Sequence, residues 1–271
     1  MIDHWKGKKN GNLPQTVEKA LDILETFATS QTSLGITELG RIVRLNKSTI
    51  YRIVQALSKK GYVIQDEQTK KYRTGYKILG IAGSLLNQND FREMARTQLE
   101  GLAKKALQTV QLGILEGNEV VFVDQREGGR DVIQLRLRIG DRAPLHCTAS
   151  GKSILAFLRE DELEELLKNY RLEARTPKTI TTISKLKRQL QVIRKNGYSF
   201  CDAEFHRDIR AVGAPILGLN MRVVGSVVLS MPTIRMKTNQ VAYYGEMVKE
   251  TGRAISKGLG CPDEEGRKDK V

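Results

Sequence analysis

The sequence predicts an α+β protein in two parts, a small helical part in front of a larger part built on an antiparallel sheet. The chain has 271 residues, which is long for one domain and comfortable for two. Apolar residues recur at helical spacing through residues 15–60. From residue 110 onward, short apolar or alternating segments separated by turns indicate successive strands, with helices between them.

The first helix is expected from about residue 14 to a polar loop at residues 29–33. Its apolar stripe consists of Val17, Ala20, Leu21, Leu24 and Phe27. Ile36 is expected to add one short sheet residue, and Thr37 to cap a second helix. The inward residues of that second helix are expected to be Leu39, Ile42 and Val43.

A tight turn at residues 44–46 leads to a third helix with a polar outer face. Asn46 is a good N-cap, since its side chain can accept from backbone N–H groups of the first turn. The buried stripe is expected to contain Ile50, Ile53 or Val54, and Leu57. Gly61 ends the helix where the backbone turns left-handed. Strands at residues 62–65 and 71–74 then form a hairpin.

Helix, turn, helix and hairpin in this order are the pattern of a winged helix-turn-helix. Its last helix lies in the major groove of double-stranded DNA, and the wing contacts phosphates. The expected DNA contacts are Lys47, Ser48, Thr49, Tyr51, Arg52 and Gln55 on the helix and Lys70, Lys71 and Arg73 on the wing. The alternative is that these residues form a solvated helix face and hairpin. The net charge of +14 favours a polyanionic partner.

Composition also bounds the location and the chemistry. Three scattered cysteines without a CxxC pair predict neither a disulfide framework nor a structural zinc site, and we expect no cofactor. The first residues have no apolar core of a signal peptide, and no window approaches the roughly 18 apolar residues of a membrane span. We therefore expect a cytoplasmic protein.

The larger part is predicted as an α+β domain with an antiparallel sheet. Strands are expected at residues 110–115, 120–125, 133–139, 198–202, 211–217 and 223–229, with a turn at 140–142. Helices are expected at residues 92–107, 149–158, 160–168, 182–196 and 238–258. A linker helix at residues 76–90 should connect the two parts. Its apolar side needs a partner, for which a second copy of the chain is the natural choice.

Two features of this larger part bear on its chemistry. The run Thr148-Ala149-Ser150-Gly151 opens a helix, where free N–H groups attract a carboxylate. The alternative there is ordinary capping by Thr148 or Ser150. Cysteine catalysis would need a histidine within reach. His146 and Cys147 are strand neighbours that point to opposite faces, whereas Cys201 and His206 could meet across a turn. No nucleophile motif surrounds either pair, so we expect no enzyme.

Several stretches resemble IclR-type transcriptional regulators, from about Thr16 to Ile255. These are TVEKALDILETFA, ITELGRIVRLNKSTIYRIVQALSKKGYV, LHCTASGKSILAFL and RAVGAPILGLNMRVVGSVVLSMP. The resemblance implies a GAF/PAS-like effector domain and homodimers, often paired into tetramers. By resemblance, the effector positions are Ala149, Ser150, Gly151, Cys201, Asp202, Ala211, Val228 and Ser230. Arg44 departs from the family, whose members usually carry Gly in this turn.

We therefore expect a sequence-specific regulator, repressor or activator, of a catabolic operon, controlled by a small organic acid. The expected segments are a basic tail (1–13), a winged helix-turn-helix domain (14–75), a linker helix (76–90), an effector-binding and oligomerisation domain (91–260) and a polar tail (261–271). The apolar character of Cys201, Ala211 and Val228 predicts an effector more apolar than a two- or three-carbon keto acid. Two alternatives stay open: an architectural DNA-binding protein without a ligand, and a cysteine-dependent enzyme fused to a DNA-binding module.

Overall fold

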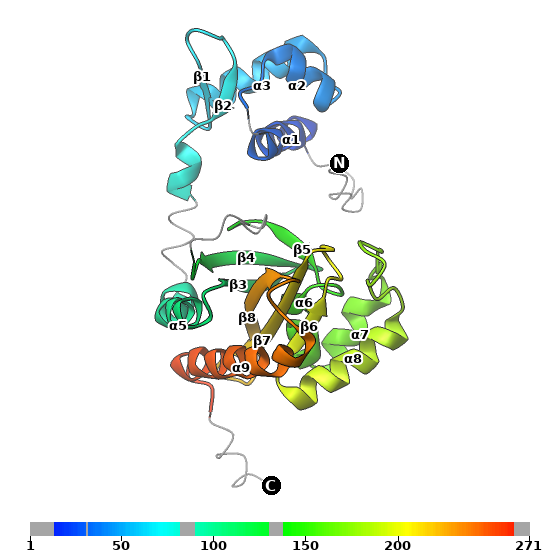
Figure 1. The fold of residues 1–271 in the computed structure, drawn as a ribbon. Helices are drawn as coiled ribbons and strands as arrows, with labels where there is room; N and C mark the ends of the chain where they lie inside the picture. Colours follow the sequence, from blue (N-terminus) through cyan, green and yellow to red (C-terminus); the bar gives the residue numbers. More distant parts are fainter. Residues whose placement is uncertain (1–13, 31, 82–89, 130–137, 263–271) are drawn as a thin grey trace. The chain divides into compact units, whose positions relative to one another are not determined.

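The computed structural model describes residues 14–30, 32–81, 90–129 and 138–262, and it divides into two compact units, Met1–Gln88 and Asn89–Val271 (Figure 1). The predicted linker helix falls partly outside these ranges. Residues 77–81 are helical, and residues 82–89 are not described. No helix in the described ranges has the length and apolarity needed to cross a membrane.

The first unit packs three helices against a two-stranded hairpin. Its elements are α1 (Gln15–Thr29), α2 (Ile36–Ile42), α3 (Lys47–Lys59), β1 (Val63–Gln65) and β2 (Tyr72–Thr74). Antiparallel pairing sets Val63 opposite Thr74 and Gln65 opposite Tyr72. The core contains Ile23, Phe27, Leu34, Leu39, Ile50, Ile53, Val54, Val63 and Tyr72. The first unit therefore has the predicted order of three helices followed by a hairpin.

The apolar stripe predicted for α1 was only partly right. Ile23, absent from that stripe, is fully buried, and Phe27 lies beside it in the core. Val17 and Leu21 were expected inside, yet they are 54% and 53% exposed. The inward face of α1 is therefore rotated relative to the prediction, and these two apolar side chains stay on the surface.

The start of α2 also differs from the prediction. Gly35 is the N-cap residue, and its N–H donates to the Glu38 carboxylate at 2.6 Å. Thr37 lies inside the helix and does not cap it. The short bridge to the hairpin is made by Leu34, which pairs with Tyr72, and not by Ile36. Ile42, expected to face inward, is 55% exposed.

The second unit is built on an antiparallel six-stranded sheet with the order β5-β4-β3-β8-β7-β6. The strands are β3 (Thr109–Glu116), β4 (Glu119–Arg126), β5 (Arg142–Pro144), β6 (Ser199–Asp202), β7 (Ile209–Leu217) and β8 (Val223–Pro232). The helices are α5 (Asp90–Ala106), α6 (Ala149–Phe157), α7 (Glu160–Lys168), α8 (Ile183–Asn196) and α9 (Val241–Gly258), with a 3-10 turn, η1 (Thr238–Gln240), before α9.

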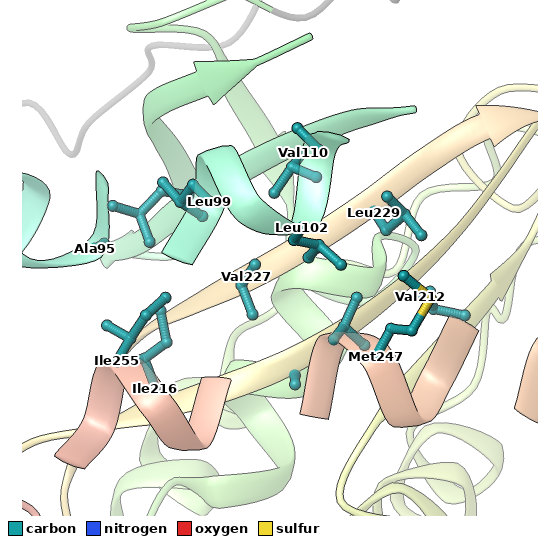
Figure 2. Close-up of a cluster of buried hydrophobic side chains, with 14 of the residues drawn as sticks. Ala95, Leu99, Leu102, Val110, Val212, Ile216, Val227, Leu229, Met247 and Ile255 are labelled. Carbon is teal, nitrogen blue, oxygen red and sulfur yellow. The ribbon is translucent and has the colours of Figure 1, made fainter. Parts of the chain in front are cut away.

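Helices cover both faces of this sheet. On one face α5 and α9 enclose a core whose members include Leu99, Val110, Val227, Leu229 and Met247 (Figure 2). On the other face α6 packs mainly on β7 and β8. Together with α7 and α8 it contributes to a second core that includes Phe122, Leu145, Leu155 and Leu190. Alternate residues of each strand therefore face different helix layers, which makes the α6 side of the sheet a separate environment.

The prediction missed one strand of this sheet. Arg142, placed in a turn from the sequence, begins the three-residue β5, which pairs with β4 through Ala143 opposite Val120. The alternating strand predicted at residues 133–139 falls mainly in 130–137, outside the described residues. The three residues of β5 are too few to show the alternating pattern by which a strand is recognised in a sequence.

Candidate nucleic-acid interface and ligand site

The two sides of α3 differ sharply in burial. Ile50, Ile53 and Val54 are buried in the core of the first unit. The residues predicted to contact DNA lie on the other side, where Lys47, Ser48, Tyr51, Arg52 and Gln55 are exposed and Thr49 is half-buried. Tyr51 is 54% exposed although it is a large aromatic residue. The apolar side fixes the helix, and the polar side remains open within its unit.

The first turn of α3 is held by Asn46, as predicted. The Asn46 Oδ1 atom accepts from the Thr49 backbone N–H at 2.8 Å and from the Ser48 hydroxyl at 2.9 Å. The helix dipole and the N–H groups of this turn favour an anion in front of it. Ser48 keeps acceptor capacity on its hydroxyl oxygen, but its proton is used locally.

One residue of the exposed side links α3 to the hairpin. The Gln55 Nε2 atom donates to the Tyr72 hydroxyl at 3.3 Å. Tyr72 is almost fully buried in β2. Gln55 is therefore held by the hairpin through one end of its carboxamide, while its other end keeps acceptor capacity. A predicted base contact thus also fixes the position of α3 relative to the wing.

The three predicted wing cations have different surroundings. Lys70 is exposed at the hairpin turn, and the Arg73 guanidinium lies over the Tyr76 ring at 5.5 Å. Lys71 instead forms an ion pair with Glu38 at 3.1 Å. The pKa of Glu38 is lowered by the hydrogen bond from the Gly35 N–H and, next, by Lys71. Lys71 is therefore partly neutralised, and Lys70 and Arg73 are the more available charges.

The turn between α2 and α3 is left-handed at Arg44, with φ 56°. A residue with a Cβ is strained in this conformation by about 1 kcal/mol. Gly40, within α2, approaches this turn closely, because a Cβ there would lie 2.9 Å from the Leu45 carbonyl oxygen. Arg44 therefore occupies a left-handed position that glycine would adopt without strain.

We expect Arg44→Gly to raise the free energy of unfolding by about 0.5–1 kcal/mol, because glycine adopts φ > 0 without strain. Arg41→Gly is the matched control, since Arg41 lies in α2 and glycine in a helix costs about 1 kcal/mol. Urea denaturation followed by circular dichroism measures both. Equal destabilisation by the two changes would contradict the strain at Arg44.

In the second unit, four predicted effector residues meet in one buried cluster. Ala149, Cys201, Ala211 and Val228 are between 2% and 8% exposed and pack together. We call these four residues the α6–sheet cluster. Ala149 is the first residue of α6, and the other three come from β6, β7 and β8. Cys201 pairs with Ala211 between the neighbouring strands β6 and β7.

The start of α6 is capped in the ordinary way. The Thr148 Oγ1 atom accepts from the Gly151 N–H at 3.1 Å and donates to the Pro144 carbonyl at 2.7 Å. A Cβ on Gly151 would lie 2.3 Å from the Leu145 backbone. The Ser150 hydroxyl is 2.5 Å from the Ser226 hydroxyl. Gly151 thus contributes close packing at the start of α6.

Asp202 and Ser230 complete the predicted effector set. The Asp202 carboxylate forms ion pairs with Lys178 at 2.7 Å and with Arg210 at 2.6 Å. Burial alone would raise the pKa of Asp202, but hydrogen bonds from these two cations outweigh it and the pKa lies below its usual range. Ser230 is 6% exposed and pairs with Ala211 in the sheet. The Asp202 carboxylate is therefore paired with two cationic side chains. Ser230 lies beside the α6–sheet cluster.

Sequence reasoning missed a pair of carboxamides on the same face. Gln111 and Gln125 are paired across β3 and β4, and the Gln111 Nε2 atom donates to the Gln125 Oε1 atom at 3.1 Å. Gln111 is 2% exposed and lies opposite Val228 in β8. The signal was present in the sequence, because a glutamine between the core residues Val110 and Leu112 is unusual in a buried strand.

Two of the three cysteines, Cys147 and Cys201, have the surroundings of packing residues. Burial raises the pKa of Cys147 to about 12, and burial also raises the pKa of Cys201. The Cys201 thiol donates to the Cys147 carbonyl oxygen at 3.1 Å. The His146 ring contacts the Tyr170 hydroxyl at 3.3 Å and the Glu173 carbonyl at 3.0 Å. A nucleophilic thiolate is thus disfavoured at both cysteines.

A buried ion pair joins α6 to the chain beyond β6. The Lys152 Nζ atom donates to the Glu204 Oε1 atom at 2.6 Å and to the Phe200 carbonyl at 2.7 Å. The Lys152 side chain is 0% exposed and that of Glu204 is 6% exposed. This pair fixes β6, and with it Cys201, against α6.

Comparison with known proteins covers nearly the whole chain. The family model for the bacterial transcriptional regulator IclR C-terminal domain matches residues 83–257, and that for the IclR helix-turn-helix domain matches residues 16–67. The chain is 35% identical to the HTH-type transcriptional regulator XynR of Escherichia coli over 248 residues, covering 92% of this chain and 98% of XynR.

Two solved structures have the same fold. The crystal structure of Thermotoga maritima IclR is 34% identical, has a TM-score of 0.78, and matches over 91% of this chain and 99% of that chain. An IclR homolog from Microbacterium hydrocarbonoxydans, solved in complex with 4-hydroxybenzoate, has a TM-score of 0.77 at 24% identity, over 90% of this chain and 98% of that chain. The second match supports the fold alone.

Proposed function

The chain belongs to the IclR family of bacterial transcriptional regulators, and from this membership we propose that it binds operator DNA through the exposed side of α3. The observation that carries the proposal is the division of α3 into a buried side and an open polar side. Arg52 and Gln55 have side chains that can hydrogen-bond to base edges in the major groove. Lys47 and the first turn of α3 would contact phosphates.

The hairpin supplies the second set of DNA contacts in this proposal. Lys70 and Arg73 would bind phosphates beside the groove, with a smaller contribution from Lys71 because Glu38 competes for it. Phosphate contacts add affinity without sequence preference. Lys70→Ala should therefore weaken binding to operator DNA and to unrelated DNA by similar factors. Gel-shift titrations with both DNAs test this. Loss of operator binding alone would contradict it.

The ligand of the second unit is proposed to be a small organic acid held at the α6–sheet cluster. The amides at the start of α6 would bind the carboxylate. Ala149, Cys201, Ala211 and Val228 offer little polarity, which favours an acid with an apolar body larger than that of glyoxylate or pyruvate. Calorimetric titration with a panel of acids tests this, and selective binding of either small keto acid would contradict it.

Control of transcription would follow from a two-state switch. A dimer must place its two recognition helices about one DNA turn apart, or a multiple of that spacing. A ligand that binds one arrangement of the dimer more tightly shifts the population toward it. Either repression or activation is compatible with this scheme, because the sign depends only on the state that the ligand prefers. The regulated genes would be those of a catabolic operon.

Assembly is proposed to use apolar surface of the first unit. Leu79 is 67% exposed and Ile81 is 49% exposed in the helical segment 77–81, and Val17 and Leu21 are exposed on α1. Burying such side chains stabilises an interface by about 25 cal/mol per Å². A second copy of the chain would bury them in a homodimer, which can pair further into a tetramer.

We expect Leu79→Glu to weaken self-association at least about tenfold, because a charge would have to be desolvated at the contact. Lys77→Glu is the matched control, since Lys77 is exposed in the same segment and already charged. Analytical ultracentrifugation measures the dissociation of both variants. An unchanged mass distribution for Leu79→Glu would contradict this interface.

A further inference from the structure

We propose that Gln111 and Gln125 recognise a hydroxyl group of the ligand, so that the effector is a hydroxylated organic acid. This inference rests on the proposed ligand site and adds a specificity-determining pair to it. The pair lies on β3 and β4, whereas most of the predicted effector residues come from α6, β6 and β7. It therefore gives the site a second polar end.

The pair faces the same side of the sheet as the α6–sheet cluster. Val110 and Leu112 point into the core under α5 and α9, so Gln111 between them points to the α6 side. Val227 and Leu229 also point into that core, so Val228 points to the α6 side as well. Gln111 and Val228 are directly paired between β3 and β8. Cross-strand neighbours of this kind have Cβ atoms about 5 Å apart.

The hydrogen bonding of the pair is incomplete. Among the described residues, the only side-chain hydrogen bond of either carboxamide is the one that joins them, at 3.1 Å. One carboxamide oxygen and one NH₂ group therefore remain unused. This holds whichever way the two amides are turned, because one donor and one acceptor are consumed in either arrangement. Gln111 is only 2% exposed, and Gln125 is half-buried.

An unused donor and an unused acceptor side by side suit a group that both accepts and donates. An alcohol or phenol hydroxyl does both, whereas a carboxylate only accepts. The ligand that fits has a carboxylate at the start of α6, an apolar body on Cys201, Ala211 and Val228, and a hydroxyl at the glutamine pair. A ligand without the hydroxyl would leave the hydrogen-bonding groups of the pair without a partner. This cost is the main reason why the site would prefer the hydroxylated acid to its deoxy form.

The test compares hydroxylated acids with their deoxy counterparts. The full-length protein is titrated by calorimetry with matched pairs, including 4-hydroxybenzoate with benzoate and 3-hydroxybutyrate with butyrate, and with sugar acids and their deoxy forms. The parent should bind the preferred hydroxy acid at least about tenfold more tightly than its deoxy partner. In Gln111→Leu this ratio should fall below about twofold, mainly through loss of affinity for the hydroxy acid.

Controls separate this role from a purely structural one. Gln191→Leu changes an exposed glutamine on α8 and should leave the ratio at the parental value. Gln125→Met changes the less buried partner and serves if Gln111→Leu does not fold. An unchanged ratio in both pair variants overturns the inference and leaves the ligand site standing. Failure of every acid to bind the parent overturns the proposed ligand site, and the inference with it.

Discussion

Replacing Lys152 by methionine should lower the free energy of unfolding of the second unit by about 3–5 kcal/mol. The Glu204 Oε1 atom would lose its partner at 2.6 Å, and its Oε2 atom has no hydrogen bond to begin with. A carboxylate left alone in a buried site is costly, because neither water nor a cation compensates it. Urea denaturation followed by circular dichroism measures the loss, since the one tryptophan of the chain is Trp5.

Two further variants isolate the buried pair as the cause. Changing Lys152 to Met and Glu204 to Leu together should recover most of the loss, because no unpaired charge remains. Lys178→Met removes a cation from the exposed pair with Asp202, whose side chains are 54% and 35% exposed, and should cost less than about 1 kcal/mol. Similar losses for Lys152→Met and Lys178→Met would contradict the account of the buried pair.

Arg52→Ala should weaken operator binding by about 1–3 kcal/mol, which is roughly 5- to 150-fold, and leave unrelated DNA much less affected. Arg52 is exposed on α3, and its side chain has no hydrogen bond or ion pair within the described residues. The change should therefore not disturb the fold. Fluorescence anisotropy with operator and scrambled duplexes at fixed salt measures both affinities.

The control for this change is Arg188→Ala, which removes an equal charge from an exposed position on α8. It should leave the ratio of operator to scrambled affinity unchanged. Affinity of Arg52→Ala for organic acids should equal that of the parent, because Arg52 and the α6–sheet cluster belong to separate units. If Arg52→Ala bound the operator as tightly as the parent does, the proposed contact between Arg52 and the bases would be wrong.

Local patterns were enough to predict the first unit in outline. The cap at Asn46 and the left-handed end at Gly61 are decided by a few neighbouring residues, and both are present. The inward side of α1 was mispredicted, because Val17 and Leu21 satisfy the same helical period as Ile23. Only the packing against α3 and the hairpin decides between two apolar sides of one helix.

In the second unit, the side-chain pairs between distant or neighbouring elements could not be predicted from the sequence. The family resemblance pointed to Ala149, Cys201, Ala211 and Val228. Ala149 meets the other three although it lies far from them in the chain. The Lys152–Glu204 pair depends on how α6 packs against the chain beyond β6, and the Gln111–Gln125 pair depends on the register of β3 and β4. A single sequence specifies neither. The sequence signal for such pairs is a polar residue inside an apolar strand. The partner of that residue becomes known only from the register of the sheet.

The central claim is that the open side of α3 reads a DNA sequence. The most direct measurement is the affinity of the full-length protein for DNA from upstream of its own gene, compared with a scrambled duplex of equal length and salt. Specific recognition predicts binding to one upstream segment at least about 10³-fold more tightly than to the scrambled duplex. Equal affinity for every upstream segment and the scrambled duplex would contradict the claim.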